Sequence, residues 1–311
     1  MQTSQHEYGQ ANTVSEPSFL GVPQVSYRIG GITFGLQSEV GLCIALEKEL
    51  RAFEVVADSC DVDLRIAWAD SLEIPTSRLS FHSGGLWSLF AESDGCRFSF
   101  LAPMVGMRPY KEAWFDPDFC SGRVLLSREY FDADRPAYPL EYPLDELLMI
   151  HRLSRGEGVE VHAVGISDGQ GRGHLFLGHS GAGKSTTARL WMGRPGVRIL
   201  SDDRIILRLR QGQVWMYGTP WHGDAGVASP DSALLTAIYL LEKGQSNKRL
   251  SLPKGRAAAE LFARSFVPHH SEKGIRSTLD FLDRVASQVP CSIFRFVPDE
   301  TAVEAICRAE V

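Results

Sequence analysis

Eight consecutive residues in the middle of the chain constrain its fold more than any other feature. Residues 178–185 read Gly-His-Ser-Gly-Ala-Gly-Lys-Ser, which matches the pattern G-x-x-x-x-G-K-[ST]. The glycines let the backbone turn so tightly that successive N–H groups face a single anion. Such a loop binds its anion at the start of a helix, where the helix dipole adds positive potential. The segment therefore predicts a strand, a phosphate-binding loop (P-loop) and a helix, in that order.

The flanking sequence has the features that this unit requires. The apolar residues Leu175-Phe176-Leu177 precede the loop and predict a strand, and a helix is expected to begin near Lys184. A Gly-rich turn at 168–173 joins this strand to an earlier one at 159–164. Further strands are expected at 197–200, 205–207, 237–241 and 292–296, with helices near 257–266 and 275–287. This order of elements predicts an α/β (α+β) fold for residues 141–311.

The preceding part of the chain shows a different pattern. Residues 26–29 and 32–36 alternate in polarity and flank Gly30-Gly31, which suits a two-residue hairpin. A second hairpin is predicted from residues 86–90 and 96–100, which flank Ser93-Asp94-Gly95. We therefore expect a β-rich domain at 25–140, after a loose polar tail at 1–24. A helix at 144–153, with early acids and late bases, opens the second domain.

Composition and charge narrow the class of protein. The 311 residues are 44% hydrophobic and 23% charged, as in a globular protein with room for two domains, and the net charge of −6 is not gathered into a run. Nucleic-acid and membrane partners are therefore not expected. The first residues do not resemble a signal peptide, and no apolar run approaches ~18 residues, which predicts a cytoplasmic protein. Six cysteines without a C-x-x-C pair predict reduced, mostly buried thiols.

The loop itself predicts the first chemical roles. We expect Lys184 to reach between the β- and γ-phosphates of ATP, and the hydroxyl of Ser185 to bind Mg²⁺, a hard cation that prefers oxygen ligands. The residues expected to contact the nucleotide are Gly178, His179, Ser180, Gly181, Ala182, Gly183, Lys184, Ser185 and Thr186.

Two carboxylates follow the next predicted strand. Asp202 and Asp203 come directly after residues 197–200, and such a pair can place one acid near the metal and the other near an incoming hydroxyl. A carboxylate able to take a proton from a hydroxyl distinguishes a kinase from an NTPase that uses water. His162, on the strand before the loop, is a further catalytic candidate, although a single strand histidine is usually structural.

Together these residues resemble a known family. His162-Ala163 on a strand, the P-loop, and Leu200-Ser201-Asp202-Asp203 are similar in order and spacing to the catalytic domain of the HPr kinase/phosphorylase family and its HPr kinase-like relatives. The resemblance covers roughly residues 145–300. It implies a P-loop fold like that of phosphoenolpyruvate carboxykinase, and transfer of phosphate from ATP or pyrophosphate to a serine hydroxyl on a small protein.

Carried over by position, the resemblance assigns roles in this chain. It makes Lys184 the phosphate-binding lysine, Ser185 a metal ligand, either Asp202 or Asp203 the base, and His162 its helper. It also implies an acidic metal ligand farther along, for which Asp224 is the nearest candidate, beside His222; Asp203 is the other metal-side acid. A basic residue near the transferred phosphate is implied as well, and three arginines compete for that role: Arg249, Arg256 and Arg264.

The leading hypothesis is an ATP- and Mg²⁺-dependent kinase that phosphorylates a serine-type hydroxyl. The acceptor would be a protein or peptide recognised partly by residues 25–140, since HPr kinase-like relatives also serve clusters that make modified peptides. Two alternatives stay open: a kinase for a small hydroxyl compound, and a nucleotide-binding regulatory module without transfer. Members of the family are commonly oligomeric, so a homo-oligomer is a candidate state.

Overall fold

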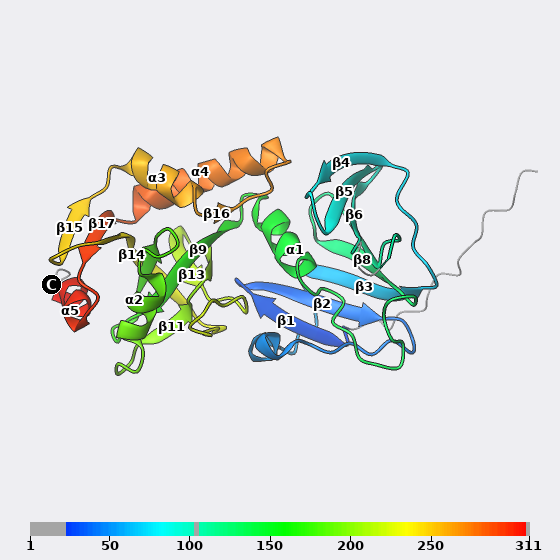
Figure 1. Ribbon diagram of the computed structural model, residues 1–311, viewed down its shortest axis with the longest axis horizontal. Coiled ribbons are helices and arrows are strands. Elements are labelled where there is room, and N and C mark those ends of the chain that lie inside the picture. Colours follow the sequence, from blue (N-terminus) through cyan, green and yellow to red (C-terminus); the bar gives the residue numbers. More distant parts are fainter. Residues whose placement is uncertain (1–22, 103–105, 309–311) are drawn as a thin grey trace, which may run out of the picture.

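The computed structural model describes residues 23–102 and 106–308. Two β-sheets, one in each half of the chain, lie at opposite ends of an elongated molecule, and helix α1 (Leu144–Leu153) lies between them (Figure 1). Apart from its last two residues, the predicted tail at 1–24 falls outside the described residues.

The first half forms an eight-stranded sheet in the order β1-β2-β3-β8-β7-β6-β5-β4. Its strands are β1 (Val25–Ile29), β2 (Ile32–Ser38), β3 (Val62–Ala69), β4 (Arg78–His82), β5 (Trp87–Glu92), β6 (Gly95–Phe100), β7 (Lys111–Phe115) and β8 (Ser121–Ser127). Both predicted hairpins are confirmed. In the first, Gly30 and Gly31 have φ of 61° and 73°, as a two-residue turn with positive φ at both positions requires. The second turn is tighter than predicted, because Gly95 already belongs to β6.

Helix α1 has the predicted bounds and packs on this first sheet. Its Leu144, Leu148 and Met149 are fully buried in the same core as the inward-facing residues of β1–β3 and β6–β8. A short 3-10 helix, η1 (Lys48–Phe53), adds Leu50 and Phe53 to that core. Ile206 of the second sheet also joins it, so the two halves pack against each other. The division of the chain near residue 140 stays a prediction.

The second half forms a nine-stranded mixed sheet. Its strands are β9 (Gly158–Ser167), β10 (Arg172–Leu177), β11 (Arg198–Ser201), β12 (Arg204–Arg210), β13 (Gln213–Tyr217), β14 (Ser232–Lys243), β15 (Lys248–Ser251), β16 (Ser265–Phe266) and β17 (Cys291–Phe296). The main order is β10-β9-β12-β13-β14-β17-β15, and β11 and β16 pair with β9. An additional parallel pairing of β10 with β14 closes β9, β12, β13, β14 and β10 into a ring.

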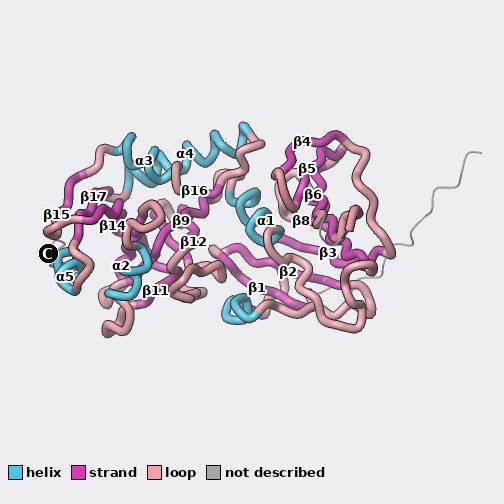
Figure 2. The backbone as a smooth tube through the Cα atoms, in the orientation of Figure 1, coloured by secondary structure: helices cyan, strands magenta, loops and turns pink. Residues whose placement is uncertain are grey.

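Helices cover both faces of the second sheet. The apolar side chains of α2 (Lys184–Trp191) and α5 (Glu300–Arg308) share one core with Phe176 and Tyr239. Those of α3 (Lys254–Phe262) and α4 (Glu272–Gln288) share another core with alternate residues of the same strands. Figure 2 shows α3 and α4 together along one side of this half, apart from α2 and α5. The molecule is thus mostly sheet with a few helices, as expected for an α+β fold.

Two sequence-based expectations need correction. The helix predicted to continue to Phe266 ends at Phe262, because Ser265 and Phe266 pair with β9 as strand β16. The cysteines were expected to be mostly buried, but none is fully buried: Cys43 and Cys307 are exposed and the other four are half-buried. Among the described residues, no helix is both long enough and apolar enough to cross a membrane.

Candidate active site

Strand β9 brings the predicted site residues close together in the second sheet. On one edge it pairs with β10, where Ala163 faces Leu177, the residue before the P-loop. On its other edge it pairs first with β11 and then with β12, where His162 faces Arg204. Asp202 and Asp203 lie at the point where the chain passes between these two strands, and the N–H of Ala163 donates to the carbonyl of Asp203 at 3.0 Å. The two motifs are therefore neighbours across a single strand.

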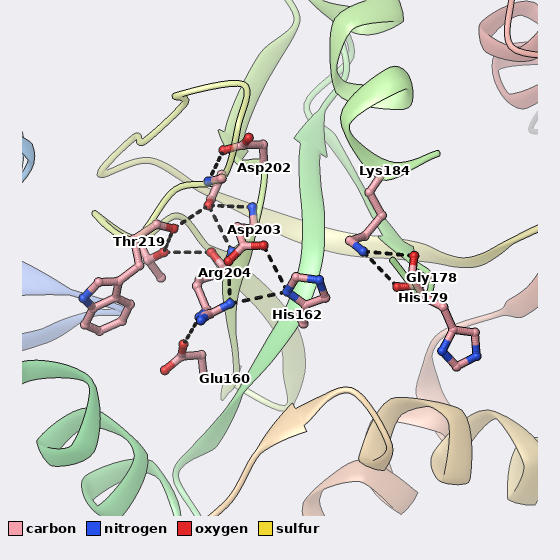
Figure 3. Close-up of polar contacts among 12 residues, drawn as sticks. Glu160, His162, Gly178, His179, Lys184, Asp202, Asp203, Arg204 and Thr219 are labelled. Carbon is pink, nitrogen blue, oxygen red and sulfur yellow. Dashed lines mark hydrogen bonds and ion pairs between the residues drawn. The ribbon is translucent and has the colours of Figure 1, made fainter. Parts of the chain in front are cut away.

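A cavity of about 800 Å³ opens beside these residues. We call it the P-loop cavity, and the described residues that line it are His162, Ser180–Thr186, Asp202, Asp203, Gly223, Asp224, Lys243, Gly244, Phe296 and Pro298. Of the predicted nucleotide contacts, only Gly178 and His179 lie off its wall. Their carbonyl oxygens instead accept hydrogen bonds from Nζ of Lys184, at 2.9 and 3.4 Å (Figure 3).

Glycine is required where the P-loop meets helix α2. Gly181 and Gly183 have φ of 77° and 109°, a region that other residues rarely adopt. At Gly183 a Cβ atom would lie 2.6 Å from Cζ of Phe296, on the opposite wall of the cavity. The loop is therefore packed against the end of β17, and α2 begins directly at Lys184.

Lys184 provides a nearly buried positive charge at the base of the loop. It is 8% exposed. Burial lowers its pKa, the charge of Asp203 counteracts this, and Arg264 lowers it further. The electrostatic coupling to Asp203 means that the loop and the acidic turn act within one site.

The two adjacent aspartates have different partners. Asp202 is 3% exposed, and its carboxylate accepts hydrogen bonds from the backbone N–H groups of Gly223, Ala225 and Val227, at 3.0, 2.7 and 3.4 Å. Both of its oxygens are thus occupied in holding residues 223–227. Asp202 therefore fixes the loop that carries Asp224.

Asp203 instead pairs with His162. Its Oδ1 lies 3.0 Å from Nδ1 of His162, while Nη1 of Arg204 lies 3.3 Å from the same nitrogen (Figure 3). One ring nitrogen cannot both donate to the carboxylate and accept from the guanidinium, and the shorter contact favours an Nδ1–H that donates to Asp203. In that tautomer Nε2 of His162 is an acceptor. Burial raises the pKa of Asp203, but the His162 bond and the charges of Arg204 and Lys184 bring it below its ordinary value, so the carboxylate stays ionised.

Arg204 connects this pair to helix α1. Its guanidinium contacts Asp203, bonds to Oε1 of Glu146 at 2.7 Å, and lies 3.3 Å from Oε1 of Glu160. Glu160 is fully buried, and burial followed by the charge of Glu146 raises its pKa well above the ordinary value. The shift favours the protonated form of Glu160, and the shorter contact of Arg204 is the one to the carboxylate of Glu146. The ring of Phe266 covers the guanidinium, and Cζ of Arg204 lies 4.1 Å from the ring centroid.

The structure distinguishes among the remaining candidates. Asp224 lines the P-loop cavity, whereas His222 faces a different cavity, on the other side of Asp203. Of the three arginines, Arg264 lies at the P-loop, where Nη2 is 2.9 Å from Nε2 of His179. Arg249 bonds to carbonyls of α5 over the ring of Tyr239, and Arg256 pairs with Glu260.

The donor set of the cavity fits Mg²⁺ bound together with phosphate. No group of three or more His, Cys, Asp or Glu side chains in the described part of the chain could hold a metal by itself. Mg²⁺ in phosphate sites commonly uses one or two carboxylates and completes its shell with water and phosphate oxygens. The hydroxyl of Ser185 and the carboxylate of Asp224 line the P-loop cavity and could supply the protein ligands. Asp203, the other predicted ligand, lines the same cavity, where its carboxylate is bonded to His162 and Arg204.

Sequence reasoning missed several residues of the site. Arg204 directly follows the acidic pair and is the most connected of them, but an arginine at the start of a strand carries no distinctive signal. Lys243 and Gly244 lie at the end of β14, which is parallel to β10, and Phe296 and Pro298 lie at the end of β17. Parallel strands finish at the same edge of a sheet, so the topology would have predicted these residues once the strand order was known.

Comparisons with known proteins give limited help. No protein-family model matches the chain, and no curated protein matches it. A search of solved structures finds the HPr(Ser) kinase/phosphatase from Coxiella burnetii, which is 14% identical and has a TM-score of 0.29, over 48% of this chain and 91% of that chain. At this TM-score and identity the match carries no argument about fold or function, so the roles of individual residues rest on the geometry described above.

Proposed function

We propose that this chain is an ATP- and Mg²⁺-dependent kinase that phosphorylates a serine-type hydroxyl on a small protein or peptide. One observation carries the proposal: the P-loop, with Lys184 and Ser185, shares a cavity with the ionised Asp203 and its partner His162. A nucleotide-binding module that only senses phosphate does not need this second feature. A kinase needs it, because the acceptor hydroxyl must lose a proton during transfer.

In this mechanism the protein positions the phosphates and accepts one proton. The backbone N–H groups of 180–186 and Nζ of Lys184 hold the phosphate chain. The acceptor oxygen forms a bond to the γ-phosphorus while the bond from that phosphorus to the β–γ bridging oxygen breaks, so that ADP leaves. The hydroxyl proton passes to Asp203, whose orientation is set by His162 and Arg204. Mg²⁺, when bound, would neutralise charge on the phosphate oxygens.

Asp203 is the better candidate for the base, and Asp202 for support of the site. The carboxylate of Asp202 already accepts three backbone N–H groups, whereas a quarter of the Asp203 side chain, 24%, is exposed. The low pKa of Asp203 keeps it ionised and ready to accept a proton, although it makes a weaker base than a carboxylate without cationic neighbours.

The test is phosphate transfer from γ-labelled ATP with Mg²⁺, into a lysate of the native host and into a library of serine-containing peptides. Lys184→Ala is expected to reduce transfer by about 10²–10³-fold, because it removes a charge that acts on the transferred phosphate. Lys273→Ala, an exposed position on α4, is the matched control and should retain activity.

The other outcomes separate the alternatives. Stoichiometric ADP release with no labelled protein or peptide would favour a small-molecule acceptor. Tight ATP binding without transfer or ADP release would favour a regulatory module. Full activity of Lys184→Ala would contradict the proposed mechanism.

A further inference from the structure

A second cavity adjoins the P-loop cavity. It has a volume of about 410 Å³ and lies between the two halves of the chain. Its walls come from η1 and the residue before it, from the start of α1, and from residues 220–222. Asp203 lines both cavities, and Arg204 lines the second beside it. A group bound in the second cavity would therefore meet the candidate base from the side opposite the P-loop.

The charge of the second cavity is strongly negative. Five carboxylates line it: Glu47, Glu49, Asp145, Glu146 and Asp203. Arg204 is the guanidinium on its wall, and it is already paired with Glu146 and Asp203. Within the described part of the chain, the side chains of Glu47 and Glu49 are exposed and make neither a hydrogen bond nor an ion pair. These two charges are left for a group that enters the cavity.

Two of these carboxylates, Glu47 and Asp145, have pKa values above their ordinary range. Partial desolvation, followed by the charges of Glu49 and Glu141, raises the pKa of Glu47, and the charge of Lys111 opposes this. Burial raises the pKa of Asp145 to about 6, even though its Oδ2 accepts a hydrogen bond from the indole of Trp221 at 2.8 Å. A cation placed among these groups would relieve both effects.

The cavity also has apolar surfaces suited to a peptide. The indole of Trp221, Pro220 and Leu50 lie on its wall, and Tyr142 at its rim is 68% exposed. Its volume falls in the range of ligand-binding pockets. Apolar walls beside unpaired carboxylates match the two parts of a lysine or arginine side chain, which buries its stem and exposes its charge.

We propose that the second cavity is the acceptor site, and that it selects a peptide in which the phosphorylated serine stands next to a lysine or arginine. The basic side chain occupies the carboxylate-lined cavity and brings the hydroxyl to Asp203 on the shared wall. This inference rests on the proposed kinase function and adds to it the charge of the acceptor and the entrance that the acceptor uses.

A charge-swap experiment tests the inference. Two labelled serine peptides that differ only in having Lys or Glu at the flanking positions are compared, first by binding and then by phosphate transfer. The full chain should prefer the basic peptide by about tenfold or more in each assay. In the double variant Glu47→Lys/Glu49→Lys this preference should disappear or reverse. Glu54→Lys, an exposed position just after η1 that does not line the cavity, should keep the preference.

The possible outcomes separate this inference from the kinase proposal. Equal binding of both peptides to the unmodified chain would overturn the inference, whether or not either is phosphorylated. An unchanged preference in the double variant would overturn it as well. Selective binding of the basic peptide, lost in the double variant but without transfer to any peptide, would support the acceptor cavity and count against the kinase. ATP affinity is measured separately in every variant, so that damage to the P-loop is recognised.

Discussion

The P-loop cavity and the second cavity share the carboxylate of Asp203, yet the chain builds them differently. The largest part of the first wall is one continuous segment, Ser180–Thr186, whose backbone conformation follows from its glycines. The second is assembled from segments around residues 47, 145, 203 and 221, which approach only when the two halves pack together. A site for a constant group such as phosphate can be local, whereas a site for a particular acceptor draws on the whole fold.

The two cavities also differ in the way they carry charge. The P-loop cavity offers oriented N–H groups and Lys184, which suit an anion. The second offers carboxylates, two of which have no ion pair among the described residues. Asp203, with His162 and Arg204, forms the wall between the cavity that suits an anion and the cavity lined by carboxylates. Substitutions can change the shared wall, the second cavity or the P-loop cavity separately.

The largest effect is expected on the shared wall itself. Asp203→Asn should reduce kcat by about 10²–10⁴-fold, because an amide cannot take the proton of the hydroxyl, while the melting temperature changes little. Asp202→Asn should instead destabilise the fold by about 1.5–3 kcal/mol, because an amide cannot accept all three N–H groups of 223–227. Steady-state kinetics and thermal unfolding of both variants distinguish the roles. Loss of transfer in Asp202→Asn with full stability, and activity in Asp203→Asn, would reverse the assignment.

A smaller effect is expected on the second cavity alone, as a change of stability with pH. The folded protein holds the proton of Asp145 with a pKa of about 6, above the ordinary 3.8. The stabilising contribution of this group is therefore complete below about pH 4 and is lost as the pH rises through 6, a change of about 2–3 kcal/mol in the free energy of unfolding.

Urea unfolding at pH 4 and pH 7 tests this prediction. Asp145→Asn should gain stability relative to the unmodified chain as the pH rises, because it lacks the ionising group. Trp221→Phe should steepen the pH dependence of the unmodified chain, since the indole hydrogen bond lowers the pKa of Asp145. Parallel curves for Asp145→Asn and the unmodified chain would show that this carboxyl does not titrate as expected.

The smallest effect is expected on the P-loop cavity alone. Gly181→Ala and Gly183→Ala both place a side chain at positive φ, but only at position 183 would the new Cβ collide, at 2.6 Å, with the ring of Phe296. We expect Gly183→Ala to weaken ATP binding about tenfold more than Gly181→Ala, a difference of about 1.4 kcal/mol. Calorimetric titration with ATP measures it, and binding of the basic peptide should be equal in both variants. Equal ATP affinities would mean that Phe296 moves without cost.

The sequence predicted those elements whose conformation is determined by residues close together in the chain. The hairpin at Gly30-Gly31, the helix at 144–153 and the unit around the P-loop were all predictable, because their turn residues, caps and periodicity lie within the segments themselves. Helix α5 and strands β3, β4, β7, β8, β13 and β15 were not predicted individually. The end of α3 was misjudged, because pairing of β16 with β9 overrides the helical tendency of residues 263–266.

Part of the candidate site was predictable for the same reason. The sequence proposed His162, Lys184, Asp203 and Asp224 for one site, and all four line one cavity. It could not separate Asp202 from Asp203, because adjacent residues differ only in what surrounds them after folding. Nor could it show the second cavity, whose residues are up to about 175 positions apart in the chain. Their proximity depends on how α1 packs between the sheets, which no local pattern encodes.

The position of Arg204 has a consequence for engineering this protein. Its guanidinium joins Asp203 to Glu146, a buried residue of α1, the helix that packs on the first sheet. A chimera that takes residues 25–140 from another protein to redirect specificity would keep Glu146, but it would place α1 on a new surface and shift the carboxylate. The exchangeable unit is therefore the first sheet together with α1, and a graft that ends after Leu153 and carries a glutamate at position 146 should preserve turnover better than one that ends at the sheet.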